Sequence, residues 1–178
     1  MSQSSGAIRV AIDTNVLIYA LRAEAAGNPE QRELRVRALI LFDMLNEAKA
    51  NIVVPTPCVA EYLVGIYEAR RGKLLTELSR RFECASFDLQ AAELAARVWR
   101  EAHADQGGKH INRNTLKADV MIVAAAKAAG AQRLYSHDAQ CRRVSECAGL
   151  PSRDLPTHHE DMFIDREFRQ AANPPGAK

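Results

Sequence analysis

Four acidic residues of this chain share one kind of position, next to the carboxyl end of an expected strand or in the first turns of the helix near it. They are Asp13, Glu61, Asp119 and Asp138. Because the carboxyl ends of parallel strands lie along one edge of a sheet, these carboxylates are expected to line one cleft. Like charges brought together are costly unless a cation neutralises them, and hard oxygen ligands with open positions favour Mg²⁺ or Mn²⁺. Such a site assists the attack of water on a phosphodiester.

Each acid also has a plainer explanation when it is taken alone. Asp13 and Asp138 have the residue type that commonly caps helices, and Asp119 in a first helical turn would favour the helix dipole. Glu61 fits a solvated helix position. The combination is less easily explained this way, because Asp13 lies between two apolar runs and apolar stretches follow Glu61 and Asp119. We therefore treat the four acids as one candidate site.

The elements that would position these acids alternate along the chain. Short apolar runs predict strands at 8–12, 51–55, 82–87 and 132–135. Helical spacing, caps and breakers predict helices at 16–21, 29–50, 58–70, 73–81, 88–104 and 117–129, with a polar, glycine-containing loop at 105–114. This alternation predicts an α/β fold with a parallel sheet and crossover helices.

The composition fits one soluble domain in 178 residues, with 47% hydrophobic and 26% charged residues. We expect a leader at 1–7, a domain at 8–160 and a polar C-terminal tail at 161–178. No signal peptide or membrane-length apolar run is evident, so a cytoplasmic location with reduced, mostly buried cysteines is expected. A net charge of +2 does not by itself indicate nucleic-acid binding, which would need a local basic patch.

Four segments of the chain resemble the PIN-domain ribonucleases, and within them the VapC-type toxins of toxin–antitoxin pairs. The segments have the family's order and similar separations, and they are 12–19 (IDTNVLIY), 59–63 (VAEYL), 117–126 (KADVMIVAAA) and 134–138 (LYSHD). The likeness runs from about Ile8 to about Leu155. Together the segments are specific, whereas Asp-Thr-Asn alone would be weak.

The resemblance implies a single PIN-like domain, built on a twisted parallel sheet of four to five strands with helices on both faces. It also implies Mg²⁺- or Mn²⁺-dependent cleavage of single-stranded or loop RNA. By motif match, Asp13 and Asp119 resemble the principal metal ligands, Glu61 the third acid and Asp138 the fourth. Asn15 and Ser136 match polar residues that support the site, and their alternative is a turn residue bonding its own backbone.

Substrate and partner contacts are a separate set of expectations. Phosphate contacts are predicted for the basic residues before the Asp119 helix, with a solvated polar loop as the equal alternative: Lys109, His110, Arg113 and Lys117. His137 is expected to assist RNA binding or to face water. The resemblance also implies a small antitoxin partner near 28–50 and a homodimer. The stretch 157–178 exceeds the simplest relatives and fits a tail, a dimer contact or an antitoxin-facing segment.

Other functions agree with the same residues to different degrees. A haloacid-dehalogenase-like phosphatase needs a second acid two residues after the first, where this chain has Asn15. A response-regulator receiver domain needs paired acids near the first strand and a lysine after the last, where this chain has Ser136, His137 and Asp138. A housekeeping RNA-processing nuclease stays open beside the toxin. A catalytically silent PIN module is opposed by the presence of all four acids.

Overall fold

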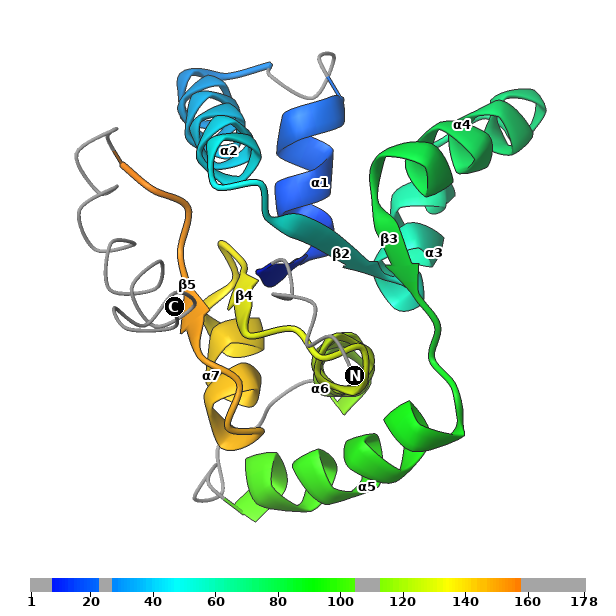
Figure 1. Ribbon diagram of the computed structural model, residues 1–178, viewed down its shortest axis with the longest axis vertical. Helices are drawn as coiled ribbons and strands as arrows, with labels where there is room; N and C mark the ends of the chain where they lie inside the picture. Colours follow the sequence, from blue (N-terminus) through cyan, green and yellow to red (C-terminus); the bar gives the residue numbers. More distant parts are fainter. Residues whose placement is uncertain (1–7, 23–26, 105–112, 158–178) are drawn as a thin grey trace, which may run out of the picture.

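Five parallel strands form one sheet in the order β3-β2-β1-β4-β5, as Figure 1 shows. The computed structural model describes residues 8–22, 27–104 and 113–157. The strands are β1 (Arg9–Ile12), β2 (Asn51–Pro55), β3 (Glu83–Ala85), β4 (Arg133–Tyr135) and β5 (Ser152–Arg153). The predicted α/β fold with four to five parallel strands is therefore confirmed.

The central strand β1 is a short, continuously apolar run because it is buried on both faces of the sheet. Val10, Ala11 and Ile12 are at most 1% exposed, because helices cover both faces of a parallel sheet and strands in such sheets are continuously apolar. β1 pairs with β2 on one side and β4 on the other, with Ile12 opposite Tyr135. The residues after β1 and β4 consequently emerge side by side.

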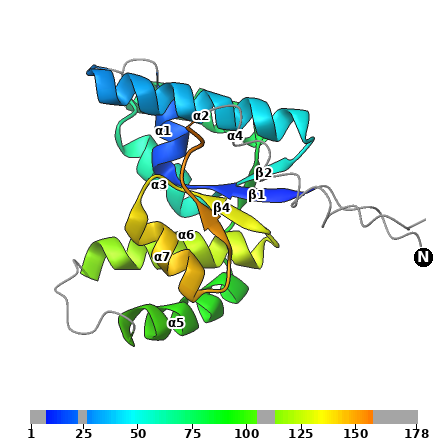
Figure 2. The ribbon, with the colours of Figure 1, turned by 90° about the vertical axis from the view of Figure 1, so that its left-hand side faces the viewer.

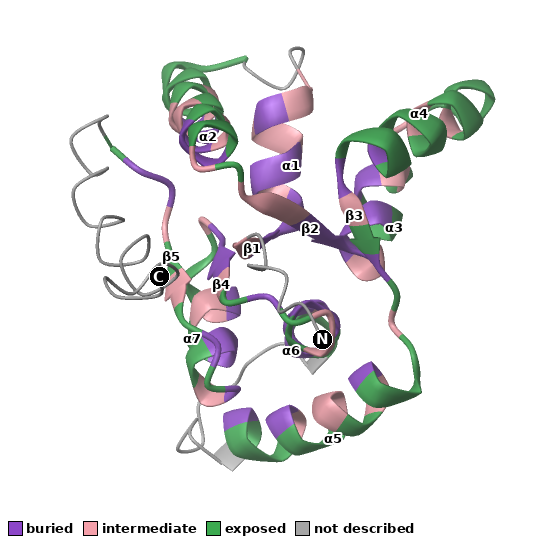
Figure 3. Cartoon of the chain, viewed as in Figure 1, coloured by how far each residue is buried: buried purple, intermediate pink, exposed green. Residues whose placement is uncertain are grey.

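Seven helices in the described part of the chain surround the sheet. They are α1 (Thr14–Leu21), α2 (Pro29–Glu47), α3 (Thr56–Val64), α4 (Glu68–Arg81), α5 (Leu89–Ala104), α6 (Arg113–Ala128) and α7 (Ala139–Cys147). Figure 2 shows α1 and α2 on one face of the sheet and α6 and α7 on the other, with α5 packed outside α6 and α7. α3 follows the carboxyl end of β2 and packs against both α1 and α6. Figure 3 shows α4 mostly exposed.

The single helix expected at 58–70 is wrong. α3 ends at Val64, Gly65 to Tyr67 form a turn, and α4 begins at Glu68. Glycine weakens a helix, and here it also leaves room for Arg22, whose guanidinium carbon would lie 2.9 Å from a Cβ at Gly65. That guanidinium packs over the Tyr62 ring at 4.6 Å. A tertiary contact thus favours the break that glycine permits.

The helix that carries Asp119 begins earlier than the expected 117. α6 starts at Arg113, which places Asp119 in the second turn rather than the first. The helix-dipole explanation for this residue is therefore wrong, because the dipole acts within the first turn.

The expected leader at 1–7 and tail at 161–178 lie outside the described residues. No helix in the ranges 8–22, 27–104 and 113–157 is long and apolar enough to cross a membrane.

Candidate active site

Asp13 follows β1 directly and is 5% exposed. Its Oδ1 accepts a hydrogen bond from the backbone N–H of Thr14 at 2.6 Å, so it caps α1 as its residue type suggests. Its Oδ2 accepts from Asn15 Nδ2 and from the Ser136 hydroxyl, both at 2.7 Å. The capping explanation and the shared-site explanation are thus compatible, because a carboxylate has about four lone-pair positions.

Ser136 and Asn15 join the loop after β4 to the loop after β1. The Ser136 hydroxyl, which donates to Asp13, accepts from the backbone N–H of Asp138 at 3.0 Å. Asn15 Oδ1 accepts from the backbone N–H of His137 at 3.1 Å. Both side chains bond across the sheet rather than only to their own turn. The sequence predicts them as supporting residues, and the structure places them between Asp13 and Asp138.

Glu61 approaches Asp13 from α3. It is exposed, and its Oε2 accepts a hydrogen bond from the Thr14 hydroxyl. Thr14 therefore contacts two of the acids, Asp13 through its N–H and Glu61 through its Oγ1.

Asp119 approaches from α6, the helix that packs against α3. It is 6% exposed, and its Oδ2 accepts from Gln140 Nε2 at 2.7 Å. The backbone N–H of Gln140 donates to Asp138 Oδ1, also at 2.7 Å, so the exposed Asp138 caps α7.

One continuous hydrogen-bonded network therefore joins the four acids of the candidate site. Starting at Glu61, it runs through Thr14, Asp13, Ser136, Asp138 and Gln140 to Asp119. We call Asp13, Glu61, Asp119 and Asp138 the acid quartet. Its members come from the ends of the two neighbouring strands β1 and β4 and from the helices α3 and α6, which pack against each other.

The electrostatics of the quartet show that its members act on one another. The pKa of Asp119 is raised from 3.8 to about 7, chiefly by burial; the Gln140 hydrogen bond opposes this rise and the charges of the other three acids contribute to it. Burial likewise raises the pKa of Asp13, with the Ser136 and Thr14 hydrogen bonds opposing it and the charges of Glu61 and Asp138 adding to it. The ion pairs found in the described part of the chain engage other carboxylates, such as Glu83 and Asp154.

The quartet has the donor chemistry of a hard divalent cation site. Its carboxylates are partly desolvated and repel one another, and a cation relieves both costs. As the side chains lie, however, no three His, Cys, Asp or Glu groups among the described residues are close enough to hold one metal ion. Hydrogen bonds direct Glu61 to Thr14 and Asp119 to Gln140. The residue types therefore fit a divalent cation, and these hydrogen bonds set the orientations of Glu61 and Asp119.

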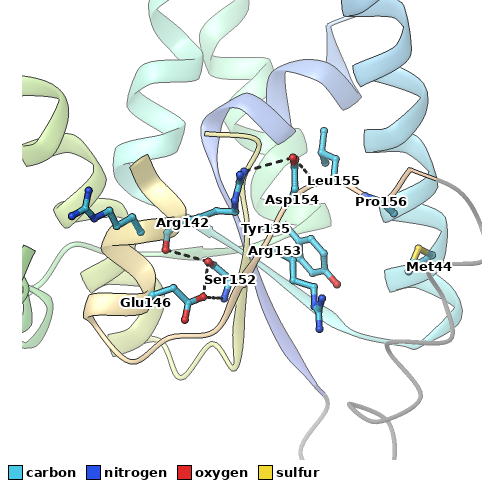
Figure 4. Close-up of a pocket in the computed structure, with 10 residues that line it drawn as sticks. Met44, Tyr135, Arg142, Glu146, Ser152, Arg153, Asp154, Leu155 and Pro156 are labelled. Carbon is cyan, nitrogen blue, oxygen red and sulfur yellow. Dashed lines mark hydrogen bonds and ion pairs between the residues drawn. The ribbon is translucent and has the colours of Figure 1, made fainter. Parts of the chain in front are cut away.

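Asp154 fixes the loop that carries His137, a connection the sequence did not indicate. Its Oδ1 lies 2.9 Å from His137 Nδ1 and 3.6 Å from an Arg37 guanidinium nitrogen on α2. Figure 4 shows the carboxylate facing Arg142 of α7, whose guanidinium also donates to the Ser136 carbonyl at 2.7 Å. Asp154 and Arg142 border a cavity of about 470 Å³ beside β5. His137 is thus held by Asp154 at one ring nitrogen instead of simply facing water.

Replacing Asp154 with asparagine is expected to lower the free energy of unfolding by about 1 kcal/mol at pH 7, because charge-assisted hydrogen bonds of a half-exposed carboxylate are lost. Burial alone would raise the pKa of Asp154, but the His137 and Leu155 N–H bonds and the Arg142 charge outweigh it and hold the pKa below 3.8. The contribution is therefore present above pH 4 and fades as the pH falls through the lowered value. Urea unfolding at pH 7 and pH 3 measures it, and Asp43→Asn on the exposed side of α2 is the control. A stability difference between Asp154→Asn and the unmodified protein that does not shrink from pH 7 to pH 3 contradicts the assignment.

Of the basic residues predicted to contact RNA, only Lys117 has a side chain within the described part of the chain. Lys109 and His110 lie outside the described residues, and Arg113 begins α6 without a described side chain. Lys117 is exposed, two positions before Asp119, and residues so spaced do not share a helix face. Their RNA contacts stay predictions.

The cysteines were expected to be mostly buried. Cys58 and Cys141 are buried, and burial raises the pKa of both thiols well above 9.0. Cys84 is instead exposed, on the edge strand β3. High thiol pKa values favour the neutral form, which is a poor nucleophile.

Thr14 and Gln140 are the site residues that the sequence reasoning missed. Thr14 stands within the Asp-Thr-Asn segment, so its place in that motif was a usable signal. Gln140 belongs to no motif, and only its position two residues after a capping aspartate hinted at a role.

Fold and site together define an α/β domain whose parallel sheet carries an acid quartet at the carboxyl ends of its central strands. The family model described as the PIN domain matches residues 10–146, which is most of the chain. The chain belongs to the PIN domain family.

Solved structures with the same fold include toxin–antitoxin complexes. VapBC2 from Rickettsia felis, bound to a DNA fragment from its promoter, matches with a TM-score of 0.58 and 16% identity, over 84% of this chain and 100% of that chain. DNA-bound VapBC from Salmonella typhimurium matches with a TM-score of 0.58 and 17% identity, over 84% of this chain and 99% of that chain. At these identities the likeness establishes the fold alone. No curated protein matches the chain.

Proposed function

We propose that this protein is a Mg²⁺- or Mn²⁺-dependent endoribonuclease that cleaves single-stranded or loop RNA. The observation that carries the proposal is the network that joins two buried and two exposed carboxylates into one quartet, with the pKa values of both buried acids raised. Family membership supports a nuclease, since PIN domains are generally nucleases.

In this proposal Asp13, Glu61 and Asp119 hold the cation and Asp138 adds the fourth negative charge. A bound divalent cation supplies an activated water and stabilises charge on the phosphodiester. The residues of this chain orient the carboxylates: Ser136 and Asn15 hold Asp13, Thr14 holds Glu61 and Gln140 holds Asp119. Without a cation the ionised carboxylates repel one another. The proposed chemistry therefore uses a metal ion rather than a covalent nucleophile.

Cleavage of labelled RNA by the intact protein tests this function. We expect internal cuts in single-stranded RNA with Mg²⁺ or Mn²⁺, none in EDTA, and recovery when the metal is restored. An RNA duplex and single-stranded DNA of the same sequence serve as substrate controls. Cleavage that survives EDTA would overturn metal dependence, and binding of RNA without cleavage at any metal concentration would favour a silent module.

Asp138 allows charge and capping to be separated. Asparagine caps a helix as well as aspartate, whereas alanine loses about 1 kcal/mol at this position. We therefore expect Asp138→Asn to unfold at the same urea concentration as the unmodified protein and Asp138→Ala to be less stable. If the charge serves the site, cleavage falls in both variants, and full activity of Asp138→Asn limits this residue to capping.

We further propose that the nuclease is the toxin of a toxin–antitoxin pair, acting in the cytoplasm as a homodimer with a small antitoxin. The support is that the two similar solved structures are VapBC complexes. A neighbouring reading frame for a small DNA-binding protein that co-purifies with this chain and relieves growth arrest is the expected finding. Harmless expression without such a neighbour favours a housekeeping RNA-processing nuclease.

A further inference from the structure

Gln140 connects two members of the acid quartet, Asp119 on α6 and Asp138 at the start of α7. It sits half-buried at the start of α7. Its side chain leaves that helix and reaches α6, where Nε2 donates to Asp119 Oδ2 at 2.7 Å. Its own backbone N–H donates to Asp138 Oδ1 at 2.7 Å. One residue thus contacts two of the acids, by its backbone and by its side chain.

The position of this amide is set by the helix cap. Asp138 caps α7 through Gln140, and its carbonyl accepts from the backbone N–H of Arg142 at 3.1 Å. The cap in turn is held by the Ser136 hydroxyl, which also bonds Asp13. The backbone of Gln140 is therefore fixed relative to the carboxyl end of β4, and this fixed backbone directs its side chain to Asp119.

We propose that Gln140 is a positioning residue, which holds the Asp119 carboxylate by one oxygen and leaves the other oxygen for a divalent cation. The inference rests on the proposed function. In metal sites, groups that hydrogen-bond a ligating carboxylate orient it, and their loss typically weakens metal affinity 10- to 100-fold.

The chemistry of an amide suits this task. Asp119 is 6% exposed, and a carboxylate so buried needs a donor. A lysine or arginine would supply a donor together with a positive charge, which would compete with the cation. The glutamine amide is neutral, so it steadies the carboxylate while leaving its negative charge available to a metal ion.

Mn²⁺ binding to the full-length Gln140→Met variant tests the proposal. Methionine has nearly the shape of glutamine and a high helix propensity but no N–H donor. By electron paramagnetic resonance of free Mn²⁺, we expect affinity to fall tenfold or more. In RNA cleavage, we expect the half-saturating Mn²⁺ concentration to rise by the same factor, with the rate at saturating Mn²⁺ within about threefold of the unmodified protein. Gln90→Met, at an exposed position of α5, is the matched control.

A second substitution shows whether Gln140 acts through Asp119. In an Asp119→Asn background Gln140→Met should cause no further loss of Mn²⁺ affinity, whereas in a Glu61→Gln background it should cause its full loss. Unchanged affinity in folded Gln140→Met, or in Gln140→Ala if methionine prevents folding, overturns the role of Gln140. Equal losses in both backgrounds do the same. If the unmodified protein itself fails to bind Mn²⁺, the proposed function is what has failed.

Discussion

Replacing Asp119 with asparagine is expected to reduce metal-dependent RNA cleavage by roughly a thousandfold or more. A metal ion contributes several kcal/mol to stabilising a phosphodiester transition state, and about 4 kcal/mol corresponds to that factor. The substitution is mild for the fold, because the asparagine oxygen can still accept from Gln140 Nε2 where Asp119 Oδ2 does now. The loss therefore reports the missing charge rather than unfolding. Initial rates of RNA cleavage at saturating Mg²⁺ or Mn²⁺ measure it.

Two further variants make this result specific. Asp43→Asn removes an exposed charge from α2 and should leave cleavage unchanged. Asp13→Asn should lose activity as Asp119→Asn does. In this variant, however, the new amide N–H group faces Asn15 Nδ2, which now donates to Asp13 Oδ2, so that two donors meet. Some of its effect would then be structural. If both Asp119→Asn and Asp13→Asn cleave RNA within tenfold of the rate of the unmodified protein, the acid quartet is not the catalytic site.

The metal-free protein is expected to lose stability as the pH rises from about 4 to about 7. Over this range the unfolded chain has ionised Asp119, while burial and the neighbouring acids keep the folded carboxyl protonated up to about 7. The folded state then binds more protons, and stability falls with rising pH. A rise from 3.8 to about 7 would correspond to about 4 kcal/mol if fully expressed. Buried sites in real proteins have a higher effective dielectric constant than a dry interior, which reduces the expected loss to about 2 kcal/mol.

Asp119→Asn should remove most of this loss, so that the inactive variant is more stable than the unmodified protein at pH 8 in EDTA. Asp13, whose pKa is also raised by burial, accounts for the loss of stability that remains in the Asp119→Asn variant. Urea unfolding at pH 5 and pH 8, in EDTA and in Mg²⁺, measures the effect. Mg²⁺ should restore the stability of the unmodified protein at pH 8 and do little for the variant. A variant less stable than the unmodified protein at pH 8 would show that Asp119 carries no unfavourable charge.

Local sequence was sufficient where neighbouring residues decide the structure. Arg9–Ile12 is a strand because a doubly covered sheet buries Val10, Ala11 and Ile12 in succession. Asp13 caps α1 because its carboxylate reaches the next N–H. The same reasoning failed at Gly65, where Arg22, more than forty residues earlier, occupies the space a side chain would need. It failed again at Arg113, where α6 extends into a segment whose polar composition suggested a loop.

The sequence by itself determined which residues can carry chemistry: four acids, each near a strand end, and the Asn15 and Ser136 side chains beside them. Tertiary structure decided how they are joined. β1 pairs with β4, so Ser136 bonds Asp13 across 123 residues of sequence, and α7 packs on α6, so Gln140 reaches Asp119. A hydrogen bond of this kind depends on strand order and helix packing, which bring atoms within 3 Å that no local pattern relates. The four acids could therefore be selected as candidates from sequence, whereas Thr14 and Gln140, which hydrogen-bond to them in the fold, were not.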